Sequence, residues 1–289
     1  MGQALNLRKH QSTGFLAPES EYIRRQIWWS LVINDWLQIP LQAGHSGVDR
    51  MTAGLEFPDC MAKDLDAQPS SRPLHYLSVL AQLSSTLRQF HENISLIEED
   101  FTSLAAATSS ADQEISAIVS QLPVHLQPDD QVTSESRSRD AANPWLSWQK
   151  ESLCILLLYY RLVINRPLFV GRNQGSESFK KAETVCLDAS HSILSSLEEF
   201  DGGDPVSHRR LIWYSKIIVH QRLVLTYDRS FLLPAFGAAA TLRTCGSGCA
   251  CGSTENHKAE LDKCIKWFDR ASIRSSYAAS AAQVLRAMF

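Results

Sequence analysis

The residues of this chain best suited to metal chemistry are a group of thiols and one imidazole near the carboxyl end. Cys245, Cys249 and Cys251 fall within a stretch of seven residues, and His257 follows six residues later. Three thiolates and one imidazole are enough for tetrahedral coordination of zinc or copper. Their spacing matches no established zinc module, and glycine and serine fill the gaps between them. We therefore interpret this segment as a flexible loop, and we expect neither a metal nor an organic cofactor.

Motifs for nucleophilic or nucleotide chemistry do not occur in the sequence. It contains no Gly-x-Ser-x-Gly elbow, no His-Glu-x-x-His pair, no phosphate-binding glycine loop and no dinucleotide fingerprint. Seven cysteines, an odd number and mostly single, fit reduced thiols of an intracellular protein. Nine scattered histidines are interpreted as surface or core residues rather than general bases. The sequence thus favours a function other than catalysis.

Two charged residues, Asp35 and Arg166, could form a shared polar site. Asp35 follows an apolar helical segment, and a charge on a mostly buried helix needs a partner because uncompensated burial costs several kcal/mol. Arg166 ends another predicted helix, and its planar guanidinium suits bidentate pairing with a carboxylate. We hypothesise that Asp35, or a polar group beside it, meets Arg166 above a floor made by Trp28 and Trp29.

The segment that positions Asp35 has the pattern of a helix buried on most of its circumference. At helical spacing it presents two apolar rows and one narrow polar row. The rows are Ile23, Ile27 and Leu31; Trp28, Val32 and Trp36; and Gln26, Ser30, Asn34 and Gln38. Arg24 cannot pair with Asp35 within this helix, because eleven residues separate them by roughly 16 Å along the axis.

The periodicity of the remaining chain is also helical, and no strand alternation is evident. Further helices are predicted over residues 73–104, 111–121, 143–165, 180–200, 209–232 and 257–288. The polar segment 127–143 reads as a linker between an amino-terminal part, 1–126, and a carboxyl-terminal part, 144–289. The sequence predicts an all-α protein, an irregular multi-helix bundle that forms either one large domain or two closely packed helical halves.

The predicted central helix is the most apolar element. Asn143 can cap it, Pro144 suits its first turn, and Pro167 is expected to end it near Asn165. Its centre, 153–160, is apolar all round but too short to cross a bilayer. We therefore expect a buried helix and no membrane contact.

Composition and charge limit the classes of function. Hydrophobic residues make up 44% and charged residues 20% of the chain, as in ordinary globular proteins. The formal net charge is −3, so no bulk positive field is present to hold a nucleic-acid backbone. The first fifteen residues lack the features of a secretory signal. We expect an intracellular protein that does not bind DNA by itself.

The order of residues from Glu21 to Asp35, which we call the tryptophan segment, resembles the hallmark of a known family. An acidic residue, the pair Arg24-Arg25, the pair Trp28-Trp29, an apolar run and Asp35 follow one another. This pattern resembles that of the fungal-specific transcription factor domain, the helical regulatory region of fungal binuclear zinc-cluster activators. Further similar segments are Ala4 to Leu7, Leu122-Pro123, and Tyr160 followed by Asn165-Arg166-Pro167-Leu168. The resemblance covers about residues 4–168 and implies that these arginines, tryptophans, Asp35, Tyr160, Arg166 and Pro167 form a structural or pocket motif.

The chain also departs from that family. Asn6 stands where the family usually has glycine, and a Gly-Arg-Pro expected after the tryptophan helix is missing. The six-cysteine zinc cluster that binds DNA in full-length regulators is not present, since Cys60 is the single cysteine of the first half. Either a truncated regulator or a stand-alone form of the domain would account for this.

The resemblance implies a nuclear regulatory domain that controls fungal metabolic or secondary-metabolite genes. Its expected partners are other regulator chains or the transcription machinery, with a small apolar ligand as a further candidate. An alternative is a cytoplasmic, cofactor-independent cyclase or isomerase of secondary metabolism, with Asp35, His45 and Arg166 as its polar groups. A third reading is a decoy that pairs with full-length regulators and inhibits them.

The hypothesis of an Asp35–Arg166 pair predicts a stability effect. Replacing Asp35 with alanine should lower the free energy of unfolding by several kcal/mol, because the cation it neutralises would be left without a partner. Thermal denaturation of the variant measures the effect. An unchanged melting temperature would remove the pairing from consideration.

Overall fold

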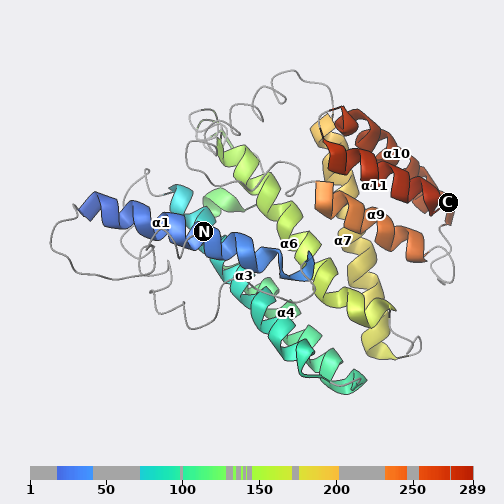
Figure 1. Cartoon of the computed structure of the whole chain (residues 1–289), viewed down its shortest axis with the longest axis horizontal. Helices are drawn as coiled ribbons and strands as arrows, with labels where there is room; N and C mark the ends of the chain where they lie inside the picture. Colours follow the sequence, from blue (N-terminus) through green and yellow to red (C-terminus); the bar gives the residue numbers. More distant parts are fainter. Residues whose placement is uncertain are drawn as a thin grey trace. The chain divides into compact units, whose positions relative to one another are not determined.

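The fold was obtained as a computed structural model of the chain. It describes residues 18–41, 72–97, 100–127, 133, 134, 138, 141, 145–170, 176–201, 232–245, 254–273 and 275–288. These residues are 92% helical, with eight α-helices and no strand (Figure 1). The predicted all-α class is thereby confirmed.

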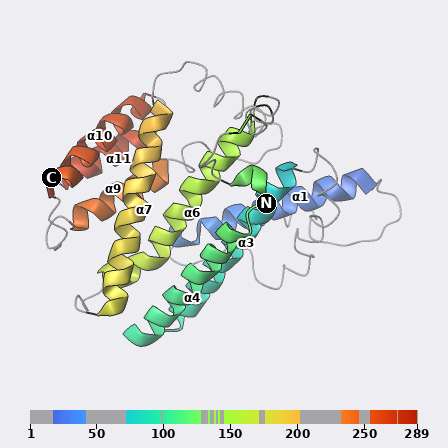
Figure 2. The same ribbon diagram turned by 180° about the vertical axis from the view of Figure 1, so that it is seen from behind.

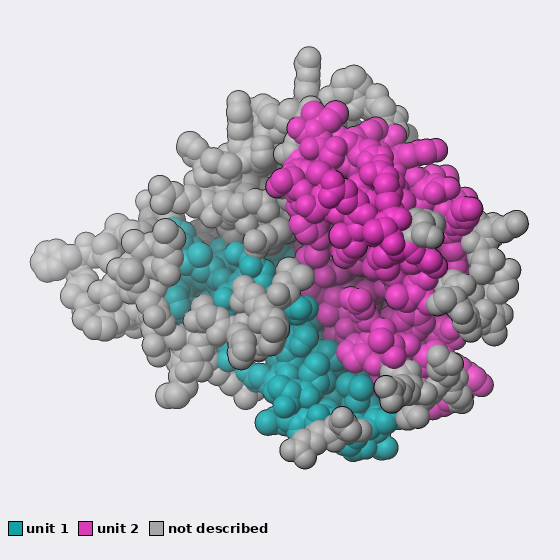
Figure 3. Space-filling model, turned by 45° about the vertical axis from the view of Figure 1, so that its right-hand side comes forward, with its two compact units in different colours: residues 1–127, 218–223 teal, residues 128–217, 224–289 magenta. Residues whose placement is uncertain are grey.

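The chain divides into two compact units (Figure 3). Unit 1 takes in Met1–Gln127 and Ile218–Leu223, and unit 2 takes in Pro128–Ile217 and Val224–Phe289. Each unit has its own buried apolar residues.

The described part of unit 1 is built on three α-helices. They are α1 (Pro18–Leu37), α3 (Arg72–Ser95) and α4 (Phe101–Ser120), with short 3-10 turns η1 (Ile39–Leu41) and η4 (Val124–Leu126). α3 is the central element, because α4 lies antiparallel against it and α1 packs on it as well (Figure 1). Leu83 and Leu87 of α3 and Ile115 of α4 are fully buried between the helices.

The prediction of a single long helix from Pro73 to Leu104 is wrong, because the chain turns back between Ser95 and Phe101. α3 ends at Ser95, and α4 begins at Phe101 and includes the shorter helix predicted at 111–121. Asp100 causes the new start: its carboxylate accepts hydrogen bonds from the backbone N–H groups of Thr102 and Ser103 at 3.0 and 3.2 Å. Such an N-cap satisfies donors that the first helical turn leaves free.

Five α-helices are described in unit 2. They are α6 (Trp145–Val170), α7 (Glu177–Asp201), α9 (Leu233–Cys245), α10 (Thr254–Ser272) and α11 (Ser276–Ala287). α6 and α7 form one antiparallel pair and α10 and α11 another, while α9 packs against α7, α10 and α6 (Figure 2). α7 confirms the helix predicted at 180–200, and α6 confirms the predicted central helix apart from its end.

α6 continues past Pro167, where we expected it to stop. Its last turn is held in place because Leu168 is buried and Phe169 stacks on Phe179 of α7, with ring centroids 6.3 Å apart. Proline in that turn removes one backbone donor, and this packing offsets the loss. The centre of α6, residues 153–160, is buried on most but not all of its circumference, because Cys154 is exposed.

α6 is long enough to span a bilayer. Gln149–Val170 has a mean hydropathy of 1.6, and 56% of it is buried inside the structure. The core helix of a water-soluble protein has the same length and composition, so this stretch is weak evidence for a membrane span.

The carboxyl-terminal helices differ from the prediction. The single helix predicted over 257–288 is two, because Ser275 accepts from the Ala278 N–H at 3.4 Å and starts α11 anew. α9 was not predicted at all. The helix predicted over 209–232 lies outside the described residues except for its last residue, Leu232.

The small residues of α9 allow it to approach its neighbours closely. Ala235, Ala238 and Ala239 are fully buried. At Gly237 a Cβ atom would lie 2.9 Å from Cε2 of Tyr159 on α6, closer than two carbon atoms can approach. Because Tyr159 is itself buried, its ring has little room to move.

We predict that Gly237→Ala destabilises the protein by about 1–3 kcal/mol, because overpacking outweighs the gain of about 1 kcal/mol in helix propensity. Chemical denaturation measures the change. In a Tyr159→Leu background the same substitution should cost clearly less, since the opposing ring edge is gone. Equal costs in the two backgrounds would contradict the proposed contact.

Candidate functional site

The tryptophan segment lies on α1, and its tryptophans are buried where α1 packs on α3 within unit 1. Trp28 and Trp29 are 3% and 4% exposed, and Trp36 is buried as well. Trp29 and Trp36 meet edge to face, with ring centroids 6.4 Å apart. Ile27 is 39% exposed, so the row of tryptophans, rather than the row that contains Ile27, faces the core.

Arg88 of α3 completes this cluster. Its guanidinium carbon lies 4.7 Å from the centre of the Trp36 ring, and its Nε donates to Oε1 of Glu92 at 2.8 Å. The Arg88 residue is 7% exposed, so both the ring face and the carboxylate stabilise a charge that is largely out of water. We call Trp28, Trp29, Trp36, Arg88 and Glu92 the tryptophan–arginine cluster.

Sequence reasoning did not identify Arg88 or Glu92. The available signal was an arginine on the apolar side of a long helix with a glutamate four residues later. That spacing is common on exposed helix faces, and the role of Arg88 follows only from the packing of α1 on α3.

The predicted motif residues are distributed over both units. Asp35 is half-buried on α1 in unit 1, whereas Tyr160 is buried and Arg166 exposed on α6 in unit 2. The pairing of Asp35 with Arg166 therefore stays a prediction. Arg24 and Arg25 lie on α1 outside the part whose side chains are described. His45 also lies outside the described residues.

Arg166 lies within electrostatic reach of two buried groups of unit 2. Burial is the main cause that raises the pKa of Tyr159, and Tyr277 adds to it while the positive charge of Arg166 opposes it. Burial likewise raises the pKa of Cys186 to about 12, again partly opposed by Arg166. The phenol and the thiol therefore stay protonated at neutral pH, and neither supplies a base or a nucleophile.

The predicted metal candidates, three cysteines and His257, form no metal centre among the residues that the structure describes. Cys245 ends α9, Cys249 and Cys251 lie outside the described residues, and His257 is buried on α10. Among the residues that the structure describes, no three His, Cys, Asp or Glu side chains are arranged to hold a metal ion. Burial also raises the pKa of Cys264 to about 12.

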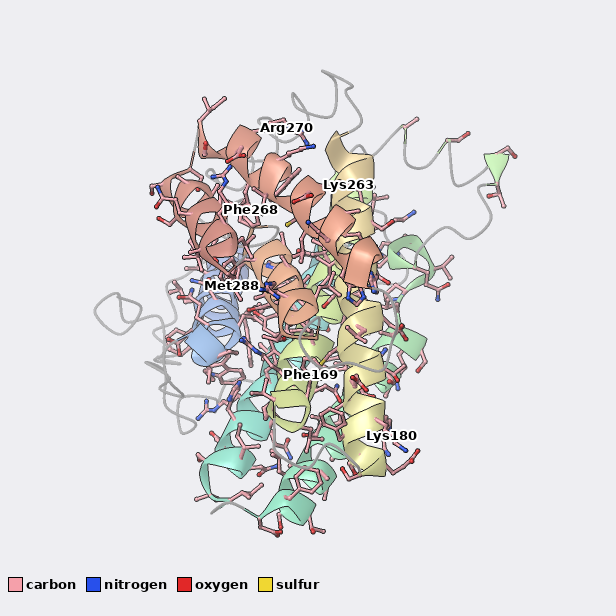
Figure 4. All side chains as sticks on the ribbon, turned by 90° about the vertical axis from the view of Figure 1, so that its right-hand side faces the viewer. Phe169, Lys180, Lys263, Phe268, Arg270 and Met288 are labelled. Atoms are coloured by element: carbon pink, nitrogen blue, oxygen red, sulfur yellow. The ribbon has the colours of Figure 1, made fainter. Side chains whose placement is uncertain are left out.

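α10 has one buried and one exposed face in unit 2. Phe268 is fully buried, whereas Lys263 and Arg270 lie on the exposed side (Figure 4). Lys180 is likewise exposed near the start of α7. The polar contact between α7 and α10 comes from residues near the amino end of α10.

This contact joins His191, Glu260 and His257. Nδ1 of His191 lies 2.6 Å from Oε2 of Glu260, and the His191 and His257 rings are 5.2 Å apart. His257 is 4% exposed, and its Nδ1 has no hydrogen-bond partner in the described part of the structure. Burial lowers the pKa of His257, His191 lowers it further, and Glu260 partly opposes both. Sequence reasoning missed this cluster because its two ion-pair members are 69 residues apart.

The tryptophan–arginine cluster predicts a stability effect of Arg88. Arg88→Gln should destabilise the protein by about 2–4 kcal/mol, because it removes the cation–π contact and leaves the Glu92 carboxylate without this donor. Urea denaturation measures the loss. Gln89→Ala, at the exposed neighbouring position, is the matched control and should change stability by less than about 0.5 kcal/mol. Equal effects of the two substitutions would contradict the assignment.

Comparisons with known proteins give no further indication of function. No protein family, curated protein or solved structure matches this chain. The resemblance to the fungal transcription factor domain thus depends on the residues quoted above, and membership of that family stays a prediction.

Proposed function

We propose that the chain is a transcription factor-like regulatory domain that acts through protein contacts, without DNA contacts of its own. The observation that carries this proposal is the burial of Trp28 and Trp29 among the helices that the structure describes in unit 1. Residues of the segment that resembles the family hallmark thus form the core of a helical domain, as that resemblance implies. The nucleus is the proposed compartment, and other regulator chains or the transcription machinery are the proposed partners.

The chemistry of the described side chains supports regulation over catalysis. Cys186 and Cys264 are buried thiols held in their protonated form, and burial raises the pKa of Tyr160 as well. Arg88 is engaged with Trp36 and Glu92. These groups stabilise packed helices, and none of them is prepared to attack or deprotonate a substrate.

The charge of the chain supports contacts with proteins rather than with DNA. A formal net charge of −3 gives no general attraction to phosphates, which supplies most of non-specific DNA affinity. A regulatory domain of this kind needs a separate DNA-binding module, either on the same polypeptide or on a partner.

A reporter assay tests the proposal. The chain, fused to an unrelated DNA-binding module, should change transcription from a promoter that carries the matching site. The Arg88→Gln fusion should lose the effect because unit 1 is destabilised, and the Gln89→Ala fusion should keep it. Protein levels are measured in parallel, so that degradation of the variant is recognised.

Deletion of the gene separates regulation from catalysis. Regulation predicts loss of a set of transcripts, measured by RNA sequencing, together with their metabolic products. Intact transcripts with one accumulating intermediate would instead support the cyclase or isomerase reading and overturn the proposal.

A further inference from the structure

We propose that His191, Glu260 and His257 form a proton-operated latch that holds the first turns of α10 against α7 at neutral pH and releases them in mild acid. The proposal concerns unit 2 alone and is independent of the proposed transcriptional function. It adds a response to pH that the resemblance does not imply.

The closed latch has a defined hydrogen-bond arrangement. Nδ1 of His191 lies within hydrogen-bond distance of Oε2 of Glu260, at 2.6 Å. His257 lies 5.2 Å from the His191 ring at an angle of 40° and is buried. Its Nδ1 has no partner among the described residues, so the neutral ring is the form that this position accepts at least cost.

A proton on His257 changes this balance. The imidazolium would carry its charge and an additional N–H into a site where the described residues offer Nδ1 no hydrogen-bond partner, close to a second imidazole. Glu260 compensates only in part, since its carboxylate is already bound by His191. Movement of the first turns of α10 into water removes both penalties, because the imidazolium is then solvated.

The sign of the pH effect follows from the direction of the pKa shift. Burial lowers the pKa of His257 in the closed state relative to the ordinary value of 6.5. The closed state therefore binds fewer protons than the open state below that pH. The His257 contribution to closure is fully present above about pH 6.5 and is lost as the pH falls from there towards the lowered pKa of the closed state, by at most about tenfold per pH unit for one proton.

Two charged groups on the neighbouring helices α9 and α11 have partners away from the cluster. From α9, Arg243 donates through Nε to the carbonyl of Met288 at 2.7 Å. From α11, Arg286 pairs with Asp269, twelve residues beyond His257 along α10.

Near the cluster itself, the neighbouring charges lie in solvent. Asp188, one turn before His191 on α7, is exposed, as are Lys258 and Asp262 on α10. Solvent weakens their effect on a buried ring. His191 and Glu260 are accordingly the groups that decide the charge of His257.

The packing of unit 2 makes this opening local. α10 packs mainly on α11 and α9 and meets α7 over a short stretch. His257 and Glu260 lie within the first two turns of α10. Release of these turns leaves the α6–α7 pair and the α10–α11 pair in place.

Hydrogen exchange of the full chain, followed by mass spectrometry at pH 7.5, 6.5 and 5.5, tests the latch. EDTA is present throughout, so that no metal competes for the imidazoles, and rates are corrected for intrinsic exchange. Peptides from the first half of α10 should lose protection as the pH falls below 6.5, by at most about tenfold per pH unit for one proton. Peptides from α6, which contains no histidine, serve as the internal reference and should not respond.

Substitutions test whether His257 is the group whose protonation releases α10. His257→Phe keeps a buried ring but cannot ionise, so α10 protection should become independent of pH over this range. His257→Gln, which is also uncharged, provides the same test if the phenylalanine variant does not fold. His91→Gln is the matched control: His91 is a partly buried histidine of unit 1 whose pKa is also lowered by burial, and its loss should leave the response of α10 unchanged.

Two results would overturn the latch. One is a wild-type chain whose α10 peptides keep the same protection from pH 7.5 to 5.5. The other is a His257 variant whose α10 peptides lose protection in acid as steeply as those of the wild type. Neither result bears on the reporter assay or the gene deletion, so the latch and the regulatory function fail separately.

Discussion

The structure depends on a constraint that acts in both units: removing a charged or polar group from water costs free energy unless a partner or a change of charge compensates for it. Arg88 satisfies it through the Trp36 ring and Glu92, and this allows α1 to place its tryptophans against α3. At the surface, Asp100 meets a related need of a helix end, because its carboxylate accepts hydrogen bonds from the free N–H groups at the start of α4. His257 meets the same demand by staying neutral, which makes its site sensitive to protons.

Packing of small residues is the second determinant of unit 2. α9 brings alanines and Gly237 against its neighbours, and the Tyr159 ring occupies the space that a side chain at 237 would need. Close approach of helices increases the number of dispersion contacts, each weak but together substantial. The same burial keeps Tyr159 and Cys186 protonated, so the interior that stabilises unit 2 also suppresses reactivity.

Helix content was predictable, whereas several helix boundaries and both polar clusters were not. The row of Trp28, Val32 and Trp36 was predicted to be apolar and buried, and these three residues of α1 are buried. Apolar periodicity predicted helices α6 and α7. The turn before Asp100 was missed because apolar residues keep their helical spacing across it. α9 was missed because alanine and glycine give little amphipathic contrast, although alanine favours helix.

The sequence by itself determined that the described chain is helical and that its tryptophan segment is buried, because both follow from local periodicity and side-chain polarity. It also determined the absence of a bulk positive charge. Tertiary structure alone decided that Arg88 lies over Trp36 and that His191 meets Glu260 and His257. These contacts join helices whose separation along the chain is set by loops and packing, and no local pattern of residues encodes which faces will meet.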